Sequence, residues 1–376
     1  MSENRKRRVL FVIDNLSTGG AQRQLVNLAV GMQRRNYEIE FFCYAQGDLL
    51  ARPLQDAGIP VHWSFKKSRF STEVISSLRD LMKSGGFELA LSFLTTPNFY
   101  NILAGRLLTN DKIPVVVSER FCDLPGLVPK MELFAREFYR AASHVTTNSQ
   151  HQHNNLAKMY PYLKNRLSRI YNGYDLDTFT PAPREPENNP LRLVTISSVS
   201  PYKNGLCLVE ALKILREDYQ LKPEVSWIGK RYETGVNHAY AQQMGQKIES
   251  YGLQDQWHWL GQRTDIVDQL HQHDVLVHPS YGEGMPNVVC EAMACARPVI
   301  VTNTLDHNNI VQEGKSGMLF HWDNPAELAE KIAQMARTSP ADRQQMGQYG
   351  RAYAEQHLTL ERFVDDYDKL FQSLMQ

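Results

Sequence analysis

Two glutamates stand eight positions apart in a stretch that also carries glycines and a proline. Glu283 and Glu291 lie in residues 280–294, just after a strand-like apolar run. Pro286 suits the first turn of a helix, where its missing N–H is not needed, so we expect a helix to begin at Pro286 or Asn287. Glu283 then lies in the loop before the helix, and Glu291 lies one turn in.

The amides at the start of this helix form a positive N-terminus, which attracts phosphate without the help of a cation. Gly282 and Gly284 allow a ligand to approach the backbone closely. A nucleotide diphosphate could lie on the amides while each carboxylate accepts hydrogen bonds from sugar hydroxyls. One glutamate alone would be interpreted as a solvated charge, but the glycines, the proline and the spacing together favour a nucleotide-sugar site. The residues predicted to line the donor are Gly284, Met285, Pro286, Asn287 and Val288.

The chain resembles the large retaining glycosyltransferase family 4, whose fold is the two-domain GT-B architecture. The hallmark of the family is E-x7-E followed by small residues and a buried strand, and Glu283, Glu291, residues 292–294 and residues 298–302 fit it closely. The resemblance covers nearly the whole chain and is specific for the family, but it does not identify the substrate. The other segments that carry it are Gly19–Gly20, Asn172–Gly173 with Phe179 and Pro181, Leu260–Arg263 with Asp265, and Gln312–Leu319.

The resemblance implies roles on the donor side. Glu283 would bind the hydroxyls of the donor sugar, and Glu291 would bind the ribose. The further residues implied in donor binding are Gly19, Gly20 and Arg263.

The family contacts the diphosphate with a basic pair, an Arg after the first strand of the second domain and a Lys a few residues on. Lys203 matches the Lys, whereas Ser198 or Val199 stands where the Arg is commonest. Lys203 must therefore carry more of the phosphate contact. Taken alone, it would be interpreted as a surface lysine at a helix start. The candidate helpers are Ser200, Lys230 and Arg231.

On the acceptor side, many family members carry a His after the fourth or fifth strand of the first domain, beside the reacting sugar. Here the corresponding run ends in Ser118, Glu119 and Arg120, so the His is absent and these three residues are the candidate wall of the site. Glu119 could orient the acceptor hydroxyl or accept its proton, and Arg120 could pair with phosphate. A structural ion pair at the end of a strand is an equally good interpretation of the two charges.

The mechanism implied by the family is front-face attack with retention of the anomeric configuration, in which the departing diphosphate helps to take the acceptor proton. Such a reaction needs positive potential at the leaving group more than it needs a protein nucleophile. The expected catalytic residues are Glu283, Lys203 and Glu119. We expect no covalent nucleophile, no metal ion and no cofactor, since the nucleotide-sugar is a substrate.

Two further patterns have features of metal sites. Asp175-Leu176-Asp177 looks like the D-x-D of the other major glycosyltransferase fold, but here it lies beside Asn172–Gly173, where the family has a structural turn. The pairs His151/His153 and His271/His273 have a spacing that brings side chains together on a strand, but both lie in helical stretches, where the i and i+2 side chains diverge. We expect neither pattern to bind a metal.

Short apolar runs alternate with longer stretches of helical period from the start of the chain, which is typical of βαβ units that build a parallel sheet. The first run leads into Gly19–Gly20 and a helical stretch, which is a Rossmann-like opening. A second series begins near Leu193, after a proline-rich and charged segment. The expected strands are Val9–Ile13, Ile39–Tyr44, Leu89–Phe93, Val115–Ser118, Val145–Thr147, Leu193–Ile196, Val225–Gly229, Val275–Val277 and Val299–Val301.

These elements predict an α/β protein of GT-B type, with two Rossmann-like, doubly wound domains and a ligand site in the cleft between them. The predicted boundaries are residues 1–175 for the N-terminal acceptor domain, 176–190 for the linker and 191–357 for the C-terminal nucleotide-sugar domain. A strong apolar face in residues 358–376 predicts a C-terminal helix that packs back on the N-terminal domain.

Length and composition suit such a protein, because 376 residues fit two α/β domains of ordinary size. The 41 Lys and Arg residues equal the 41 Asp and Glu residues, so no overall charge attracts nucleic acid. The five cysteines are odd in number and scattered, which suits a reducing cytosol. No run approaches the roughly 18 apolar residues of a membrane span. We therefore expect a cytoplasmic protein.

A lipid-linked acceptor would require a basic or apolar face on the first domain. The cluster Arg5–Arg8 is interpreted first as a solvated N-terminal tail, and contact with anionic lipid head groups is the alternative. Peripheral contact with the cytoplasmic face of the membrane is therefore a hypothesis. The residues that could make it are Arg5–Arg8, Lys66, Lys67 and Arg69.

By the same resemblance, the leading functional prediction is a hexosyl- or N-acetylhexosaminyltransferase that uses a UDP- or GDP-linked sugar. Its acceptor would be a glycan or lipid-linked glycan in surface-polysaccharide biosynthesis, such as an O-antigen or capsule. One alternative is a sugar-nucleotide epimerase, which shares the GT-B fold, but the N-terminal half lacks an evident set of acidic and His catalysts. The other is a non-catalytic subunit that binds a nucleotide-sugar; loss of a motif carboxylate would favour it, and both are present.

Overall fold

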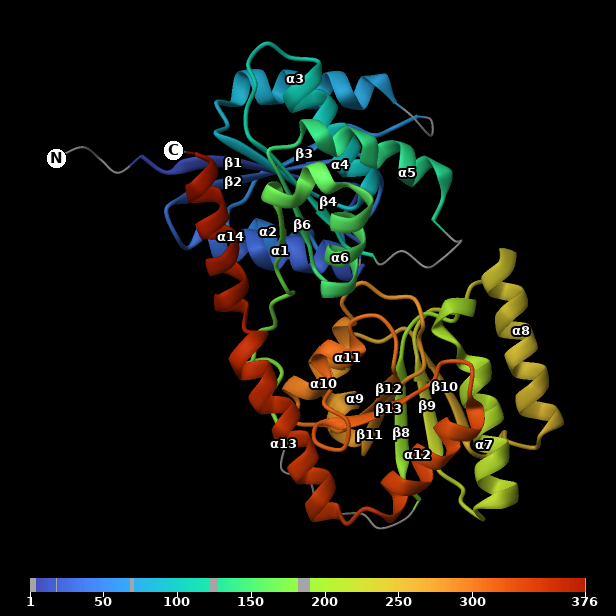
Figure 1. The fold of residues 1–376 in the computed structure, drawn as a ribbon. Helices are drawn as coiled ribbons and strands as arrows, with labels where there is room; N and C mark the ends of the chain where they lie inside the picture. The colour runs from blue at the N-terminus through green and yellow to red at the C-terminus, as the bar shows by residue number, and fades with distance from the viewer. Residues whose placement is uncertain (1–4, 18, 68–70, 122–127, 182–189, 376) are drawn as a thin grey trace. The chain divides into compact units, whose positions relative to one another are not determined.

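The structure is a computed structural model that describes residues 5–17, 19–67, 71–121, 128–181 and 190–375. The chain divides into two compact units, each built on one parallel β-sheet (Figure 1). Unit 1 comprises residues 1–173 and 360–376, and unit 2 comprises residues 174–359. Residues 176–181 and 190 of the predicted linker belong to unit 2, and residues 182–189 lie outside the described residues.

Unit 1 contains a seven-stranded sheet with the strand order β3-β2-β1-β4-β5-β6-β7 in the described part of the chain. The strands are Arg7–Ile13 (β1), Tyr37–Cys43 (β2), Val61–Trp63 (β3), Leu89–Phe93 (β4), Val115–Glu119 (β5), His144–Thr147 (β6) and Leu167–Arg169 (β7). The α-helices are Gly20–Gln33 (α1), Ala51–Asp56 (α2), Thr72–Gly85 (α3), Thr95–Ile102 (α4), Lys130–Glu137 (α5), Gln150–Met159 (α6) and Leu360–Leu374 (α14).

Side chains of β1 alternate between two buried layers, as the period of a strand requires. Val9, Phe11 and Ile13 lie in the core that includes α1 and α14, whereas Leu10 and Val12 lie in the core that includes α3 and α4. Both faces of the sheet are therefore covered, which explains why the central strands are continuous apolar runs rather than alternating ones.

The C-terminal helix α14 belongs to unit 1, as the apolar face of residues 358–376 predicts. Phe363, Tyr367 and Phe371 are buried, and the ring of Phe371 meets that of Phe11 edge to face at 6.4 Å. The helix packs on α1 closely enough that a Cβ at Gly31 would lie 2.4 Å from Val364 Cγ2. The last helix therefore completes the core of the first unit.

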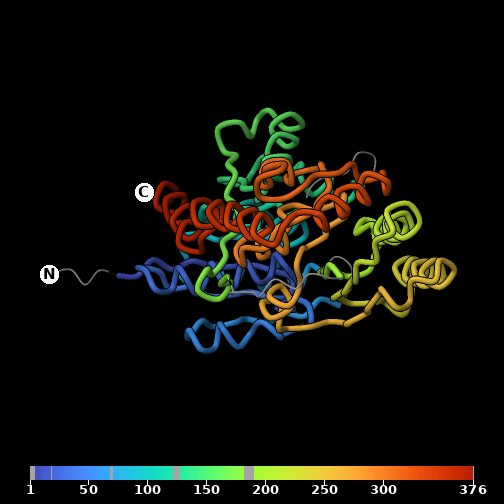
Figure 2. The backbone as a smooth tube through the Cα atoms, turned by 90° about the horizontal axis from the view of Figure 1, so that it is seen from below, coloured from blue at the N-terminus to red at the C-terminus, as the bar shows by residue number. Residues whose placement is uncertain are grey.

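Unit 2 contains a six-stranded sheet with the order β10-β9-β8-β11-β12-β13 in the described residues. The strands are Arg192–Ile196 (β8), Glu224–Ile228 (β9), Trp257–Gly261 (β10), Val275–His278 (β11), Val299–Thr302 (β12) and Gly317–Phe320 (β13). The α-helices are Gly205–Asp218 (α7), Gly235–Ser250 (α8), Ile266–Gln272 (α9), Asn287–Ala294 (α10), His307–Ile310 (α11), Pro325–Arg337 (α12) and Pro340–His357 (α13). Helix α8 lies beside α7 in both backbone views (Figures 1 and 2).

The predicted α/β class with two doubly wound units is confirmed, and all nine expected strands correspond to strands of the structure. The sequence pattern missed β3, β7, β10 and β13. Strands β3 and β7 have three residues each, and β10 reads Trp-His-Trp-Leu-Gly, so neither length nor apolar continuity marked them. All four are the end strands of their sheets. Less burial is demanded there of β3, β7 and β10, whereas β13 is a short, largely buried apolar run, Gly-Met-Leu-Phe.

The strand order of each sheet reverses beside its first strand. In unit 2 the chain moves outward from β8 through β9 to β10 and then returns to β11 on the other side of β8. Connections on either side of such a point diverge, which opens a crevice at the carboxyl ends of the two strands. In unit 2 the place favoured for a ligand is thus the pair of loops after β8 and β11.

Candidate functional site

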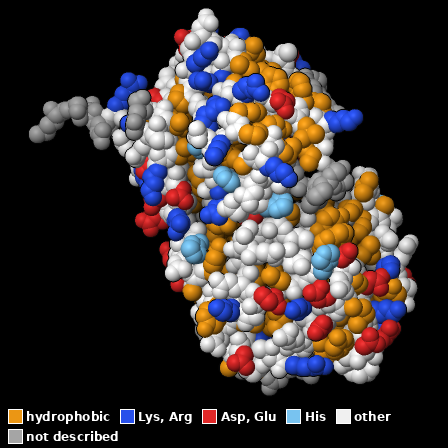
Figure 3. Space-filling model, in the orientation of Figure 1, with side chains coloured by type: hydrophobic (Ala, Val, Ile, Leu, Met, Phe, Trp, Pro, Cys, Tyr) orange, Lys and Arg blue, Asp and Glu red, His pale blue; other side chains and the backbone are white. Residues whose placement is uncertain are grey.

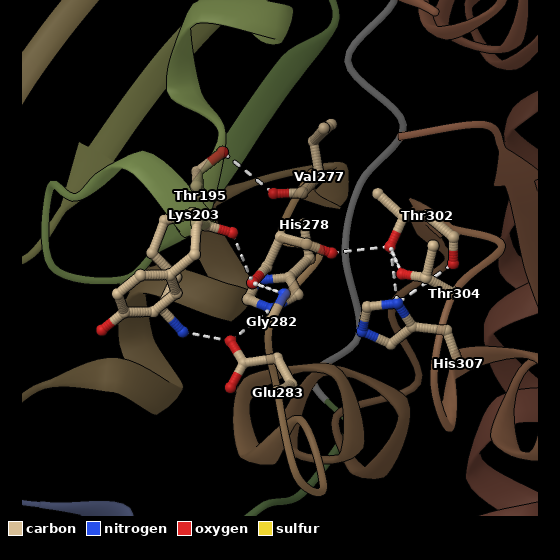
Figure 4. A network of polar contacts seen from close by, with 11 residues as sticks. Thr195, Lys203, Val277, His278, Gly282, Glu283, Thr302, Thr304 and His307 are labelled. Atoms are coloured by element: carbon tan, nitrogen blue, oxygen red, sulfur yellow. Dashed lines mark hydrogen bonds and ion pairs between the residues drawn. The ribbon is translucent and has the colours of Figure 1, made fainter. Parts of the chain in front are cut away.

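The two loops at the reversal point of unit 2 carry two of the three predicted catalytic residues, Lys203 and Glu283. Lys203 ends the short 3₁₀ helix Pro201–Lys203 after β8, and Glu283 follows β11. The two strands pair in parallel, and Thr195 Oγ1 donates a hydrogen bond of 2.9 Å to the carbonyl of Val277 (Figure 4). Residues that are 80 positions apart in the chain are thus brought into contact.

The carboxylate of Glu283 is bound through one oxygen. Its Oε1 accepts a hydrogen bond from Lys203 Nζ and a second one from His278 Nε2, at 3.2 Å (Figure 4). Neither contact involves Oε2, which has no protein partner among the described residues. The side chains of Lys203 and Glu283 keep 14% and 16% of their exposure, so the pair is shielded but remains reachable by a ligand.

The charges at this cluster follow from the contacts. Burial acts to raise the pKa of the Glu283 carboxyl, but the charge of Lys203 and the hydrogen bond from His278 outweigh it and hold that pKa well below its usual range. Burial lowers the pKa of His278 below its ordinary value, against the attraction of Glu283. At neutral pH the cluster therefore contains a carboxylate, an ammonium and a neutral imidazole.

A second layer of hydrogen bonds ties the loops together behind Glu283. Ser280 Oγ donates to the carbonyl of Tyr202 at 3.1 Å, and Tyr281 N donates to the same carbonyl at 3.0 Å. Thr302 Oγ1, at the end of β12, donates to the carbonyl of Ser280 at 2.6 Å. The segment that carries Lys203 and the segment that carries Glu283 are therefore fixed to each other and to β12.

Helix α10 begins at Asn287, one of the two predicted positions, with Pro286 as its N-cap. Its first intrahelical hydrogen bonds run from Val289 N and Cys290 N to the carbonyl of Pro286. The positive end of the helix dipole lies three residues after Glu283 in the chain. Side-chain packing supports this start, since Tyr174 Oη donates to Asn287 Oδ1 at 2.7 Å. The predicted donor residues Gly284, Met285, Pro286 and Val288 are buried around it.

Glu291 lies within α10 and is 3% exposed, so it is more deeply buried than Glu283. The two motif carboxylates thus have different environments: Glu283 is partly exposed in the loop after β11, and Glu291 is buried within α10. Contact of Glu291 with a ribose stays a prediction.

The segment after β8, which lacks the family's Arg, is buried and closely packed against Gly229. Val199 is fully buried in the core, whereas Ser200 is 1% exposed and its hydroxyl has no partner among the described residues. Gly229, after β9, has a φ of 150°, and a Cβ there would lie 1.9 Å from the carbonyl oxygen of Ser197. Only glycine allows this approach. Of the candidate helpers, Ser200 therefore has an unused hydroxyl close to Lys203 in the chain.

The other basic candidates are engaged elsewhere. The guanidinium of Arg231 lies over the Trp259 ring at 4.7 Å, and the ammonium of Lys230 lies over the Tyr232 ring at 5.2 Å. Arg263 makes two hydrogen bonds to Asp265, of 2.7 and 2.6 Å, and it follows β10 at the outer end of the sheet. No contact among the described residues joins Arg263 to the Lys203–Glu283 pair.

Glu119 lies in unit 1 at the end of β5 and forms a buried ion pair. Its carboxylate accepts hydrogen bonds from Arg136 Nε and Nη2, at 3.3 and 3.2 Å, and from Tyr139 Oη. Glu119 and Arg136 are 1% and 0% exposed. The ion-pair interpretation is thus the arrangement found, with Arg136 rather than Arg120 as the partner. Both carboxylate oxygens are occupied, which disfavours Glu119 as the group that takes the acceptor proton.

The remaining acceptor-side and glycine candidates also lie in unit 1. Ser118 is fully buried and its Oγ accepts a hydrogen bond from Arg120 Nη1 at 3.4 Å, and its contact with an acceptor stays a prediction. Arg120 lies over the Phe93 ring at 4.1 Å and donates to Asn172 Oδ1. Gly19 is the N-cap of α1, and Gly20 is its first residue.

The first metal-like pattern closes a local turn, and the histidine pairs lie in helices or just after one. The carboxylate of Asp175 accepts hydrogen bonds from Asp177 N at 3.0 Å and from Thr178 Oγ1 at 2.7 Å, which closes a local turn. His151 and His153 lie in α6, as predicted, but His273 lies just after α9 in extended conformation and bonds to the carbonyl of Gln269. Across the described ranges, no group of three or more His, Cys, Asp or Glu side chains is placed to hold a metal ion.

Sequence reasoning missed the residues behind Glu283. His278 ends β11, and its contact with Glu283 has a local signal, since the two are five positions apart with a turn between them. Its neighbour His307 follows β12, and no local pattern could have placed it beside His278. Arg136, the partner of Glu119, was missed for the same reason.

Comparisons with known families match both units. A family model described as Glycosyltransferase Family 4 matches residues 18–178, and a model described as Glycosyl transferases group 1 matches residues 178–353. The two matches adjoin and leave only the ends of the chain uncovered. The chain belongs to the family 4/group 1 glycosyltransferases. Its fold is accordingly GT-B, as the sequence resemblance predicts.

Individual relatives of this glycosyltransferase agree with the family. An uncharacterized glycosyltransferase of Methanocaldococcus jannaschii is 25% identical over 310 residues, which cover 79% of this chain and 78% of the relative. An Escherichia coli UDP-Gal:alpha-D-GlcNAc-diphosphoundecaprenol alpha-1,3-galactosyltransferase is 30% identical over 164 residues, which cover 41% of each chain. The crystal structure of Anabaena HepE in complex with UDP and glucose superposes with a TM-score of 0.84 at 20% identity, covering 98% of this chain and 100% of that one.

The buried pair of Glu119 gives a test of its role. Glu119→Gln leaves Arg136 buried without its main carboxylate, and it should lower the free energy of unfolding by about 3–5 kcal/mol. Glu132→Gln removes the second, 36% exposed carboxylate near Arg136 and should cost less than about 1 kcal/mol. Urea unfolding of the glycosyltransferase measures both. Wild-type stability with lost turnover in Glu119→Gln would instead favour catalysis.

His307 should make the stability of the glycosyltransferase depend on pH. Burial and the nearby His278 lower its pKa in the folded protein from 6.5 to about 3. Between these values the unfolded chain binds a proton that the folded one does not, so stability falls as pH drops from 6.5 towards 3. His307→Gln should remove up to about 1.4 kcal/mol per pH unit of this slope. Urea unfolding at pH 6.5, 5.5 and 4.5 tests this, with His321→Gln, 52% exposed, as the control; an unchanged slope in His307→Gln would contradict it.

Proposed function

We propose that this glycosyltransferase takes a hexose or N-acetylhexosamine from a nucleotide-sugar and transfers it, with retention of the anomeric configuration, to a glycan or lipid-linked glycan. The observation that carries the proposal is the state of Glu283. Its Oε1 is engaged by Lys203 and His278, whereas Oε2 has no protein partner in the described residues. A shielded carboxylate oxygen of this kind is suited to accept a hydrogen bond from a sugar hydroxyl.

The leaving group is proposed to be a diphosphate that meets Lys203 and the start of α10. The helix end contributes about half a positive elementary charge, and the ammonium contributes a full one. Ser200 Oγ, which is buried and has no hydrogen-bond partner in the described part of the chain, supplies a further donor in place of the missing Arg. Positive potential fixed in advance at the place where negative charge develops lowers the barrier to departure. We therefore propose that no metal ion is needed.

The acceptor proton is proposed to go to the departing diphosphate. Glu119 is committed to Arg136 and Tyr139 and is 1% exposed, so its carboxylate is a poor base for an acceptor hydroxyl. A phosphate oxygen on the reacting face of the sugar needs no further protein group. This choice is consistent with front-face attack and retention.

The donor is proposed to be a UDP-sugar and the acceptor a lipid-linked glycan of a surface polysaccharide. Two relatives support this. HepE was crystallised with UDP and glucose, and the Escherichia coli relative has UDP-Gal and a diphosphoundecaprenol-linked sugar in its name. The likeness to HepE is at 20% identity and that to the transferase covers 41% of the chain, so both serve only to order the ligands that should be tried first.

A lipid-linked acceptor implies contact with a membrane surface, for which we propose the carboxyl edge of β3. The rings of Trp63 and Phe65 stack at 5.5 Å and are 37% and 55% exposed, and Lys66 follows them. Lys and Arg side chains gather beside apolar ones on the visible face of unit 1 (Figure 3). None of the helices in the described part of the chain has the length and apolar character that crossing a membrane requires.

The other predicted lipid contacts are less suited to this role. Arg8 belongs to β1 and is bound by Glu40, and Lys67 is partly neutralised by Glu73 at 3.3 Å. Arg5 and Lys6 precede β1, so in a parallel sheet they lie at the edge opposite to Trp63. Arg69 lies outside the described residues.

Binding of a nucleotide-sugar should be detectable without metal. In EDTA, UDP or a UDP-sugar at about 100 times its dissociation constant should stabilise the protein by about 2.7 kcal/mol, which raises the melting temperature by several degrees. Thermal shifts with UDP, GDP, ADP and their sugar conjugates measure this, and Lys203→Met should lose most of the shift. No shift with any of the compounds would favour a subunit that depends on a partner.

The two motif glutamates should affect different steps. Glu291→Ala should weaken binding of the nucleoside diphosphate itself, because a ribose contact is present in donor and product alike. Glu283→Ala should leave that binding nearly unchanged and lower turnover by about 10- to 1000-fold. Calorimetry with UDP and release of UDP from the UDP-sugar measure the two effects. Wild-type affinity and turnover in both variants would mean that the site is wrongly assigned.

Membrane contact should depend on the aromatic pair. Trp63→Ser with Phe65→Ser and Lys66→Gln should reduce flotation with vesicles that contain anionic lipid, since each removed positive charge costs about 1 kcal/mol of surface attraction. Arg5→Gln with Lys6→Gln, at the opposite edge, is the matched control. Equal flotation of the wild type and the triple variant would remove the basis for this surface.

A further inference from the structure

We propose that His278 is a positioning residue for the donor sugar: its Nε2–H holds Oε1 of Glu283 and thereby aims Oε2 at the sugar hydroxyl. The proposal rests on the proposed function, since it assigns the sugar contact to Glu283. It goes further by naming the group that fixes the orientation of that carboxylate, and by separating this role from the phosphate contact of Lys203.

The tautomer of His278 follows from its partner. A carboxylate can only accept, so the 3.2 Å contact with Glu283 Oε1 requires the proton to lie on Nε2. The opposite nitrogen, Nδ1, is buried and has no hydrogen-bond partner among the described residues. Because the imidazole is enclosed and neutral, it offers one directed donor and adds no charge that would compete with Lys203 for the carboxylate.

The position of the ring is fixed by the fold rather than by a flexible side chain. His278 is the last residue of β11, and its side chain is 2% exposed. The ring of His307 meets it edge to face at 5.6 Å, with an interplanar angle of 86°. His307 is itself fixed, because its Nδ1–H donates to the carbonyl of Thr302 at 3.0 Å (Figure 4). A donor built on a rigid strand defines the rotation of Glu283 more sharply than the four-carbon stem of a lysine can.

Binding of the nucleotide-sugar makes the hydrogen bond from His278 to Glu283 necessary. When a diphosphate arrives, Lys203 can turn from Glu283 to the phosphate, because both lie within reach of one flexible ammonium. Glu283 would then lose its charged partner and be free to rotate. The hydrogen bond from His278 remains, so Oε2 keeps its direction at the moment when the sugar must be oriented.

His273 provides a contrast within the same unit. It is also a buried histidine, 8% exposed, and its Nδ1 bonds to the carbonyl of Gln269 in the helix that precedes it. Its contacts are those of a packing residue and do not include either motif glutamate. A substitution at His273 therefore reproduces the loss of a buried imidazole from unit 2 without touching Glu283.

The test compares His278→Phe, which keeps a ring but has no donor, with His278→Gln, whose amide places an N–H near the former Nε2. The probe is UDP-glucose, or whichever UDP-sugar gives the largest thermal shift, and the readouts are UDP affinity and the rate of UDP release into water. His278→Phe should lower the release rate about 10- to 100-fold with UDP affinity changed by less than about 2-fold. His278→Gln should recover most of the rate, and His273→Phe should match the wild type.

A double variant separates positioning from other effects. In the Glu283→Ala background, His278→Phe should cause no further loss, because it acts through the carboxylate that is already absent. Multiplicative losses in the double variant would overturn the proposal, as would a normal release rate in His278→Phe. If Glu283→Ala alone keeps wild-type turnover, the proposed function of Glu283 fails instead, which is a distinguishable outcome.

A measurement on the unmodified protein guards against loss of folding in His278→Phe. In ¹⁵N-labelled protein, His278 should show a protonated Nε2 and an unprotonated Nδ1, with the resonance assigned by its absence from His278→Gln. Addition of the UDP-sugar should perturb this N–H more than addition of UDP. The opposite tautomer, or equal perturbation by both compounds, would overturn the proposal.

Discussion

The parallel pairing of β8 with β11 is the constraint on which the site depends. Leu193 and Val194 pair with Val275 and Leu276, and the loops that follow these strands carry Lys203 and Glu283. Bringing an ammonium and a carboxylate out of water is costly, and their attraction offsets the cost only when geometry is good and other polar atoms are satisfied. The hydrogen bonds of Ser280 and Thr302 fix the geometry of the two loops, and that of His278 adds a neutral donor to Glu283 Oε1, whereas Oε2 has no protein partner in the described residues. The contact between Lys203 and Glu283 is thus a consequence of the strand order.

Much of the fold could be predicted from the sequence because its signals are local. Apolar runs buried on both faces marked the central strands, and the period of residues 358–376 marked α14 together with its packing. The outer strands β3 and β10 escaped because their residues need not be apolar: β3 is Val-His-Trp, and β10 ends in the glycine Gly261 at a φ of 67°. Strand order was implied by the family resemblance, not by the period of any segment.

The candidate site likewise has a part that local sequence spacing predicts and a part that it does not. Glu283, Pro286 and Glu291 are neighbours in the chain, so their spacing alone indicated a loop, a helix start and two carboxylates. The partners that decide the state of each carboxylate were beyond such reasoning. Arg136 reaches Glu119 from a helix 17 residues on, and His307 reaches His278 only because β11 and β12 are adjacent. Residue type predicts what a group can do, and tertiary neighbours determine whether it is free to do it.

The absence of the family's Arg at Ser198 or Val199 leaves Lys203 as the cation proposed to contact the diphosphate. With two cations, one could hold the diphosphate while the other neutralised Glu283; in the function proposed for this chain, the ammonium of Lys203 would have to serve both. Since Val199 is fully buried and Ser200 carries an uncharged hydroxyl, no other positive side chain is supplied by this segment. In the proposed function, movement of Lys203 towards phosphate would change the charge balance at Glu283, and recognition of the nucleotide would thereby be coupled to the state of the carboxylate proposed to bind the sugar. The neutral imidazole of His278 is the second donor to Glu283. Its hydrogen bond would keep the carboxylate in one orientation whether or not Lys203 moves to the phosphate.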